Sequence, residues 1–190
     1  MVGAGGHAGV LWESFYRTGV GEIVGLVARE VTSELLLQAN LEVVPDEEMV
    51  NNFPADDYDL VNGIGFLPGS ELREQLFYQY KGLGYSFAPV YHPTAIISPF
   101  VRLMEGVQVL AGAVVGPNSC VGPNVIINSR ANVDHDSEIG AHVHIAPGAT
   151  LCGGVSVGEG SFVGAGSVIV HGVKLPPESF VKANSLMKMS

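Results

Sequence analysis

The sequence predicts two domains: a small α/β domain over residues 1–88 and a parallel β-helix over residues 89–190. The first part alternates short apolar runs with helical patterns, which favours βαβ units around a parallel sheet. From Tyr91 onward an apolar residue recurs at every sixth position up to Val181, and Ala, Ser or Val follows each one four positions later. A period of six matches neither the helical period of about 3.6 nor the strand period of about 2, but it matches a solenoid with three hexads per coil.

The first domain opens on a glycine-rich loop, GAGGHAG over residues 3–9, followed by a helical pattern. The apolar face of that helix is predicted to contain Val10, Leu11, Phe15 and Thr18. A glycine-rich turn ahead of a helix resembles the first βα turn of a nucleotide-binding unit, where backbone N–H groups hold phosphates. A turn that only packs the helix against a strand is the alternative interpretation.

The remaining elements of the first domain follow from apolar runs and turn residues. Residues 23–27 and 60–64 are predicted strands, and residues 46–51 are a predicted short helix. Ser70 can cap a further helix that extends to about Lys81. Its apolar side is predicted to consist of Leu72, Leu76, Phe77 and Tyr80. Together these elements predict a small Rossmann-like domain with a parallel sheet.

The corners of the β-helix are predicted by turn-forming residues at fixed places in the hexad. Proline recurs two positions after the aliphatic residue, and glycine or asparagine recurs one position later, where a positive φ is wanted. The aliphatic and small residues then point inward, and successive coils pair in parallel about 4.8 Å apart. Residues eighteen positions apart are therefore expected to stack in register.

Composition argues against several classes of function. The net charge of −10, concentrated in the first 90 residues and without a Lys/Arg stripe, disfavours nucleic-acid binding. Cys120 and Cys152 lack CxxC spacing, which predicts neither a disulfide framework nor a zinc site and fits a cytoplasmic location. No apolar run reaches the ~20 residues of a membrane helix, and no basic segment precedes the glycine loop as in a signal peptide.

One histidine is placed for acid–base chemistry. His135 comes two positions after Val133, which predicts that it lies at a corner of the β-helix and points outward. An imidazole with a pKa near 6.5 can accept a proton from a hydroxyl or a neutral amine as that group attacks a thioester. Asp134 and Asp136 flank it, and either can hold its other ring nitrogen and favour the protonated state. A solvated turn histidine is the alternative interpretation.

Stacking in register suggests how a thioester could reach this base. Gly153 is predicted one coil above His135 and His171 one coil above that, so a missing side chain would leave room for a pantetheine arm. A backbone N–H near Gly153, or the His144 ring, would then stabilise the thioester oxygen. Asn128 either orients the substrate or forms an asparagine ladder.

A second corner is predicted to be smooth enough for a slender ligand. It is formed by Pro147, Ala165 and Ala183, which stack eighteen residues apart. His142 is expected on exposed surface. The phosphates of coenzyme A would need cations, for which the candidates are Lys174, Lys182 and Lys188.

The order of motifs along the whole chain is more specific than any single one. GAGGHA at residues 3–8 is followed by NGIG at 62–65, then Arg73, then HPTAIIS at 92–98 leading into the hexads. Residues 128–154 place one histidine between two acids and a second histidine nine residues later. This pattern resembles the sialic acid O-acetyltransferase family, whose relatives include N-acetyltransferases of UDP- or GDP-linked amino sugars in bacterial glycan pathways.

The resemblance implies a left-handed β-helix, a homotrimer with acetyl-CoA between neighbouring β-helices, no metal, and a first domain that binds a sugar nucleotide. It implies that His135 is the general base, that Asp136 is the carboxylate beside it, and that His144 lies near the acetyl group. The positions that match the acetyl-CoA channel are Gly153, Ala165 and Ala183. The expected substrate contacts are Gly5, Gly6, His7, Asn62, Gly63 and Asn128. Residues 27–30, VARE, lack the acidic pair by which relatives read the nucleotide, so the nucleotide stays open.

Three alternatives accompany this expectation. The acceptor can be the amine of a nucleotide-linked sugar or a hydroxyl of a sialic-type acid, since the same histidine would serve both. A zinc enzyme of the carbonic anhydrase type also uses histidines on this scaffold, but the histidine spacing does not fit it. A sugar-nucleotide-binding or scaffold protein without activity is the non-enzymatic alternative.

Overall fold

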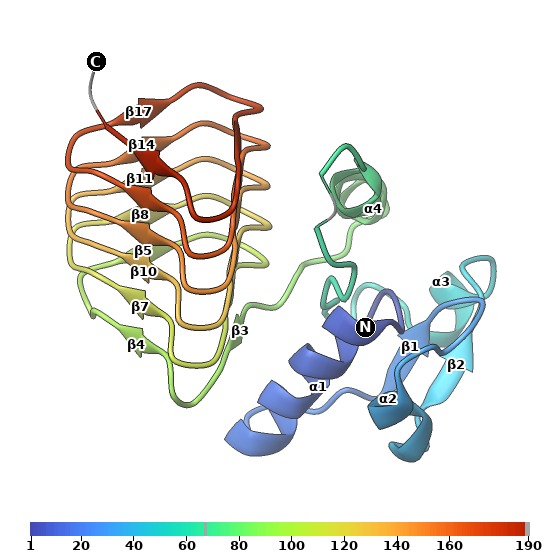
Figure 1. Cartoon of the computed structure of the whole chain (residues 1–190). Coiled ribbons are helices and arrows are strands. Elements are labelled where there is room, and N and C mark those ends of the chain that lie inside the picture. Colours follow the sequence, from blue (N-terminus) through green and yellow to red (C-terminus); the bar gives the residue numbers. More distant parts are fainter. Residues whose placement is uncertain (67, 189–190) are drawn as a thin grey trace. The chain divides into compact units, whose positions relative to one another are not determined.

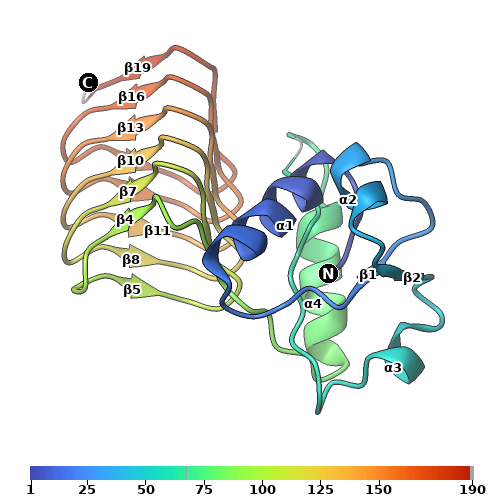
Figure 2. The same ribbon diagram turned by 90° about the horizontal axis from the view of Figure 1, so that it is seen from below.

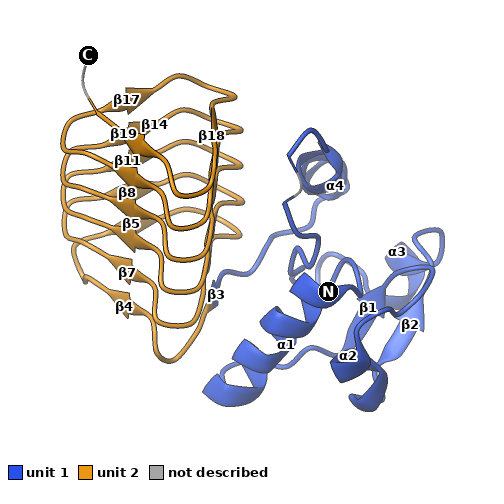
Figure 3. Ribbon diagram, in the orientation of Figure 1, with its two compact units in different colours: residues 1–90 blue, residues 91–190 orange. Residues whose placement is uncertain are grey.

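The computed structural model describes residues 1–66 and 68–188. The chain divides into two compact units, Met1–Val90 and Tyr91–Ser190, which Figure 3 colours separately. Each unit has its own core. Phe77, Tyr80 and Phe87 belong to the core of unit 1, and a column of aliphatic side chains fills unit 2.

Unit 1 combines short helices with a parallel sheet. Its helices in the described residues are α1 (Gly6–Thr18), α2 (Glu34–Gln38), α3 (Met49–Asn52) and α4 (Leu72–Gly82). The strands β1 (Gly25–Val27) and β2 (Glu42–Val44) pair in parallel. Parallel bridges extend this pair, from Val27 to Val2, from Val2 to Asn62, and from Leu60 to Phe87. The start of the chain therefore lies between segments that follow it in the sequence.

The structure corrects several predicted elements of unit 1. The predicted strand 23–27 is reduced to β1, and residues 60–64 form bridges instead of a named strand. Gly63 still donates its N–H to the carbonyl oxygen of Val2 at 2.7 Å, and the backbones lie so close there that a Cβ on Gly63 would lie 2.8 Å from that oxygen. Beyond Gly63, the carbonyl oxygen of Ile64 accepts a hydrogen bond from Arg73. The predicted helix 46–51 begins later, as α3, and α2 and β2 were not predicted.

The two longer helices bury part of the predicted face, with Leu11, Phe77 and Tyr80 inside, and expose another part of it. In α1, Leu11 is fully buried but Val10 is 42% exposed. In α4, Leu72 is 48% exposed, whereas Arg73 is buried together with Phe77 and Tyr80. The N-cap residue of α4 is Glu71, one position after the predicted Ser70, but Oγ of Ser70 still accepts the N–H of Leu72, the first residue of the helix, at 3.5 Å. The predicted face contained only apolar residues and so left out Arg73. The hydrogen bonds that explain its burial are described with the candidate site below.

Unit 2 is a three-sided parallel β-helix of two-residue strands (Figures 1 and 2). The first sheet consists of β4 (Ile96–Ile97), β7 (Val114–Val115), β10 (Asn132–Val133), β13 (Thr150–Leu151), β16 (Val168–Ile169) and β19 (Leu186–Met187). The second consists of β5 (Arg102–Leu103), β8 (Cys120–Val121), β11 (Glu138–Ile139), β14 (Ser156–Val157) and β17 (Lys174–Leu175). The third consists of β3 (Val90–Tyr91), β6 (Gln108–Val109), β9 (Ile126–Ile127), β12 (His144–Ile145), β15 (Phe162–Val163) and β18 (Phe180–Val181).

The register is the one that the hexads predict. Paired residues are eighteen apart, as in Val133 with Leu151, and the inward positions such as Val133, Ile145 and Leu151 are completely buried. From Gly106 to Asn184, each corner contains a residue with φ between 56° and 70°, which is a glycine or a short polar residue at most corners. The stacked parallel sheets are consistent with the left-handed β-helix expected from hexapeptide repeats.

Candidate active site

The corner at residues 134–136 joins β10 of the first sheet to β11 of the second. Val133 ends β10 with its side chain inward, so the following residues turn away from the core. Asp136 has a φ of 58°, a left-handed conformation that aspartate tolerates better than most residues. Oδ1 of Asp134 accepts the backbone N–H of His135 at 2.8 Å. The corner thus holds His135 outward, as the sequence predicts, with 50% of its side chain exposed.

His135 and Asp136 form a close pair at this corner. Nδ1 of His135 lies 2.6 Å from Oδ2 of Asp136. The pKa of His135 is raised above its ordinary value, mainly by this hydrogen bond and next by the charge of Asp134. The same bond is the main cause that lowers the pKa of Asp136. With Nδ1 held by the carboxylate, Nε2 can accept a proton from a reacting group.

Gly153 lies one coil above His135, as the register predicts. A Cβ on Gly153 would lie 2.6 Å from both Cε1 and Nε2 of His135. The ring itself therefore takes the space that the missing side chain leaves, so the expectation that this space is open to a pantetheine arm is wrong. Gly153 instead allows the imidazole to lie against the next coil, whose Gly154 N–H donates to the carbonyl oxygen of His135 at 2.9 Å.

His144 is not brought together with His135 within one chain. It lies on β12 of the third sheet, which is the side of the prism opposite the corner at residues 134–136. Its Nε2 is 3.0 Å from Nδ2 of Asn128, and its ring meets Phe162 edge to face at 5.3 Å. A separation of nine residues is half of an eighteen-residue coil. The nine-residue spacing between His135 and His144, on which the family resemblance partly rests, therefore places the two histidines on opposite sides of the prism.

The other predicted polar residues of unit 2 have local partners. Oδ1 of Asn128 accepts the N–H of Ser129 at 2.7 Å, and its neighbours eighteen residues away are Leu110 and Ala146, so it forms no asparagine ladder. The expectation that His142 lies on exposed surface is wrong: it is 3% exposed, and its Nδ1 lies 2.9 Å from Nδ2 of Asn124.

The predicted small-residue corner exists between the third and first sheets. Ala165 is half-buried and Ala183 is exposed, and the coils approach so closely here that a Cβ on Gly164 would lie 2.5 Å from the nitrogen of Ala183. The three candidate cations do not gather beside it. Lys182 is at this corner, Lys174 lies on the second sheet, and Lys188 follows β19.

The predicted substrate loop of unit 1 is built from two glycine segments. Gly5 is the N-cap of α1 and has no side chain, and the nearest atom that a Cβ on it would meet is Oγ1 of Thr32, at 3.7 Å. A Cβ on Gly3 would lie 2.6 Å from Cδ1 of Ile64, and one on Gly65 would lie 3.4 Å from Cβ of His7. The loop at residues 3–6 therefore lies against residues 63–65.

Arg73 of α4 holds the second glycine segment. Its Nη1 donates to the carbonyl oxygens of Asn62 at 3.0 Å and Ile64 at 2.5 Å, and Nδ2 of Asn62 donates to the carbonyl oxygen of Arg73 at 3.0 Å. Burial lowers the pKa of Arg73 to about 9. The side chain of Asn62 is thus used within the turn, and Gly63 is buried beside it. This explains why a charged residue replaces an apolar one on the inner face of α4.

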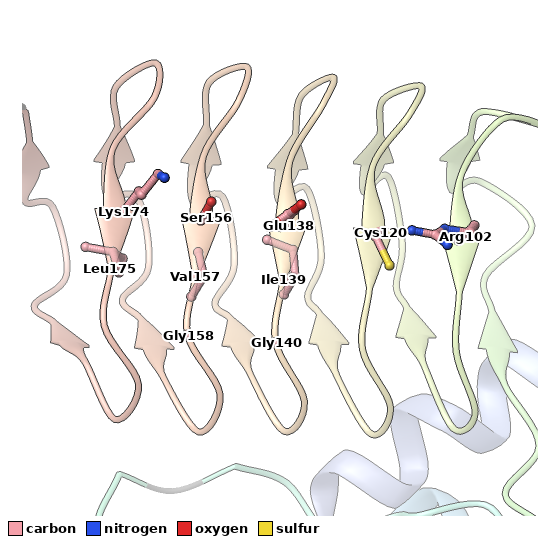
Figure 4. Close-up of a pocket in the computed structure, with 10 residues that line it drawn as sticks. All are labelled: Arg102, Cys120, Glu138, Ile139, Gly140, Ser156, Val157, Gly158, Lys174 and Leu175. Carbon is pink, nitrogen blue, oxygen red and sulfur yellow. The ribbon is translucent and has the colours of Figure 1, made fainter.

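Sequence reasoning missed a shallow trough of about 530 Å³ on the second sheet (Figure 4). Its floor includes Gly140 and Gly158, which cannot have side chains because the next coil lies too close. The sequence does contain a signal for this trough. The residue before each inward aliphatic residue points outward, and taking every eighteenth such residue gives the side chains that share one sheet. The outward side chains found in this way are Arg102, Cys120, Glu138, Ser156 and Lys174.

Comparisons with known proteins match this architecture. The family model for the bacterial transferase hexapeptide (six repeats) matches residues 136–171. A histidine mutant of perosamine N-acetyltransferase from Caulobacter crescentus, solved in complex with CoA and GDP-perosamine, has a TM-score of 0.87 and 33% identity, covering 100% of this chain and 87% of that one. The acetyltransferase domain of PglB from Neisseria gonorrhoeae FA1090 has a TM-score of 0.87 and 27% identity, covering 100% and 90%. No curated protein sequence matches the chain.

The β-helix of hexads and the matching structures define an acyltransferase of the hexapeptide-repeat superfamily. Within that superfamily, the chain belongs to the family of sugar-nucleotide N-acetyltransferases that includes perosamine N-acetyltransferase. In residues 1–66 and 68–188, none of the helices is long and apolar enough to cross a membrane.

Proposed function

We propose that this protein transfers an acetyl group from acetyl-CoA to the amino group of a nucleotide-linked sugar in bacterial glycan biosynthesis, with His135 as the general base. The observation that carries the proposal is the His135–Asp136 pair, exposed at a corner of the β-helix with Nε2 directed away from the carboxylate. Its support from comparison is the relative solved with CoA and GDP-perosamine, which aligns with the whole chain.

The proposed reaction uses the pair as follows. The neutral amine of the sugar attacks the thioester carbonyl carbon while Nε2 of His135 accepts the amine proton, and Asp136 stabilises the imidazolium that forms. The tetrahedral intermediate carries its negative charge on the former carbonyl oxygen, for which a backbone N–H at Gly153 is the candidate donor. The carbon–sulfur bond then breaks, the amide remains on the sugar, and the proton on His135 passes to the CoA thiolate.

The opposite placement of His135 and His144 supports a site shared between copies of the chain. One acetyl group cannot meet both rings within one prism, because the buried aliphatic column of unit 2 lies between them. If both contribute, His144 must come from a neighbouring subunit. The homotrimer of the family satisfies this condition, since a three-fold axis brings one corner of each prism to another side of the next. Ala165, Ala183 and Lys182 then belong to the acetyl-CoA groove of the neighbour.

We assign the nucleotide to unit 1, as a Rossmann-like domain covering residues 1–88. The sheet order places the start of the chain between Val27 and Asn62, which is a topological switch point of the kind where open α/β sheets bind ligands. Gly5, Gly6 and His7 follow this strand, and Gly63 lies at the end of its neighbour. The two free, half-buried cysteines and the use of acetyl-CoA suit a cytoplasmic protein.

The test is an assay of thiol release from acetyl-CoA with a panel of UDP-, GDP- and dTDP-linked amino sugars and sialic acids. We expect activity with at least one nucleotide-linked amino sugar and a loss of roughly 10²- to 10⁴-fold in kcat for His135→Ala. Activity confined to a sialic acid hydroxyl would replace the proposed acceptor. An unchanged rate in His135→Ala would remove His135 as the base.

A further inference from the structure

The carboxylate of Asp136 has a second partner, which lies one coil below. Nδ2 of Asn118 donates to Oδ1 of Asp136 at 3.3 Å, while Oδ2 of the same carboxylate is 2.6 Å from Nδ1 of His135. The backbone N–H of Asp136 donates to the carbonyl oxygen of Pro117 at 3.0 Å. The two oxygens of one carboxylate are therefore divided between an amide on one side and the imidazole on the other.

The residue next to Asn118 fixes the ends of the same corner. Oγ of Ser119 donates to the carbonyl oxygen of Asp134 at 3.0 Å and accepts the N–H of Ser137 at 3.2 Å. Asn118 and Asp136 also share a left-handed backbone, with φ of 60° and 58°, so their side chains leave the two coils in the same direction. The lower coil thus sets both the backbone of the corner and the orientation of its carboxylate.

The geometry points to Asn118 as a positioning residue for acetyl transfer: it holds the Asp136 carboxylate in the orientation from which its other oxygen accepts the hydrogen bond of His135. This inference rests on the proposed function of His135 as the base. Asn118 touches neither ring nitrogen, so its effect must pass through Asp136. Without the amide, the carboxylate can rotate about its side-chain bonds, and Nδ1 of His135 loses a fixed partner.

The consequence for titration follows from the groups at this corner. In the described residues at this corner, the titratable side chains are those of His135 itself, Asp134, Asp136, Cys152, His171 and Lys188, since the corner stacks positions at intervals of eighteen. Asp136 raises the pKa of His135 chiefly through its hydrogen bond, and Asn118 is the second cause that lowers the pKa of Asp136. A carboxylate that is no longer held bonds His135 for less of the time. Loss of Asn118 is therefore expected to lower the pKa of His135 toward its ordinary value.

The test variant is Asn118→Gly, because glycine accepts a positive φ without strain. The pKa of His135 is measured from its ring C–H signals by NMR in the enzyme without substrates, with the signal assigned from His135→Gln. We expect a downward shift, together with a kcat reduced about three- to tenfold and little change in KM, the size of effect of one hydrogen bond. The matched control is Glu178→Gly, whose φ of 58° is close to the 60° of Asn118 but lies at a different corner, and which should leave both quantities unchanged.

A double-mutant cycle separates positioning from general loosening of the coil. If Asn118 acts through Asp136, Asn118→Gly has no further effect on the pKa of His135 or on kcat in an Asp136→Asn background. An unchanged pKa in Asn118→Gly, or effects that add fully in the double mutant, would overturn the inference. The NMR readout needs no turnover, so a protein inactive on every sugar would refute the proposed function and still leave the role of Asn118 decided.

Discussion

The imidazole of His135 acts as a base only in its neutral form, and Asp136 sets the pH at which that form dominates. Because the pKa of His135 is raised, we expect the acid limb of kcat/KM at a higher pH than an ordinary histidine would give. Asp136→Asn removes the main cause of that rise, so the limb should move to lower pH while kcat falls roughly tenfold or more.

The control for this change is Asp134→Asn. Asp134 bonds the backbone N–H of His135, and its charge is the secondary cause of the raised pKa. We therefore expect a smaller displacement of the limb. A pH–rate profile that is the same in Asp136→Asn as in the unmodified enzyme would contradict the proposed pair.

Gly153 gives a second prediction at the scale of one residue. A Cβ there would lie 2.6 Å from the His135 ring, whose side chain can swing outward because half of it is exposed. Gly153→Ala should therefore lower kcat by roughly tenfold or more by displacing the base, with a free energy of unfolding changed by less than about 1 kcal/mol. Gly82→Ala is the control, since a Cβ at Gly82 meets nothing within 4 Å. Full activity in Gly153→Ala would show that the position of the ring is not critical.

At the scale of the element, the close approach of successive coils explains glycines that a turn does not require. Gly140 has no positive φ, yet a Cβ on it would lie 2.6 Å from the nitrogen of Glu159 in the coil above. Gly140→Ala must push these coils apart, so we expect a loss of about 1–3 kcal/mol in the free energy of unfolding, measured with a chemical denaturant. Cys152→Ala at the same hexad position should change it by less than about 1 kcal/mol.

The period of six predicted the β-helix to the residue because each inward position repeats the same environment. Val133, Leu151 and Ile169 occupy equivalent places, so one register accounts for every coil. Unit 1 offers no such repetition. Residues 60–64 look like a strand by composition, but Arg73 takes the carbonyl oxygens of Asn62 and Ile64 that a strand would need, and that contact depends on an arginine distant in sequence.

The candidate site could be predicted in part for the same reason. The outward direction of His135 and the stacking of Gly153 follow from the register alone. Two details depend on side-chain rotamers, which the hexad pattern does not specify: the His135 ring fills the space that the missing side chain of Gly153 leaves, and Asn118 shares the carboxylate of Asp136.

At the scale of the whole molecule, the opposite sides taken by His135 and His144 make a prediction about mixed oligomers. Each of His135→Ala and His144→Ala should be strongly impaired alone. When the two are co-expressed, a site with both histidines forms wherever the intact His135 of one subunit meets the intact His144 of the next. Random mixing in a closed ring recovers up to about a quarter of the activity.

The oligomer itself is measured by sedimentation, where we expect a trimer. A monomer, or a mixture no more active than its two components, would exclude the shared site. The control is His171→Ala, at the same corner as His135 but two coils above it. Its activity when co-expressed with His135→Ala or with His144→Ala should not depend on which of the two is its partner.

The left-handed backbone at Asp136 gives this residue two roles, because it bonds His135 and also forms the turn of the corner. Aspartate tolerates this conformation better than most residues, so the partner of the base also forms the bend that presents it. A histidine and an aspartate placed at the corresponding positions of another corner would have the same backbone direction, because every coil repeats the same turn. The β-helix therefore offers equivalent corner positions for a reactive pair at every third hexad along each of its edges.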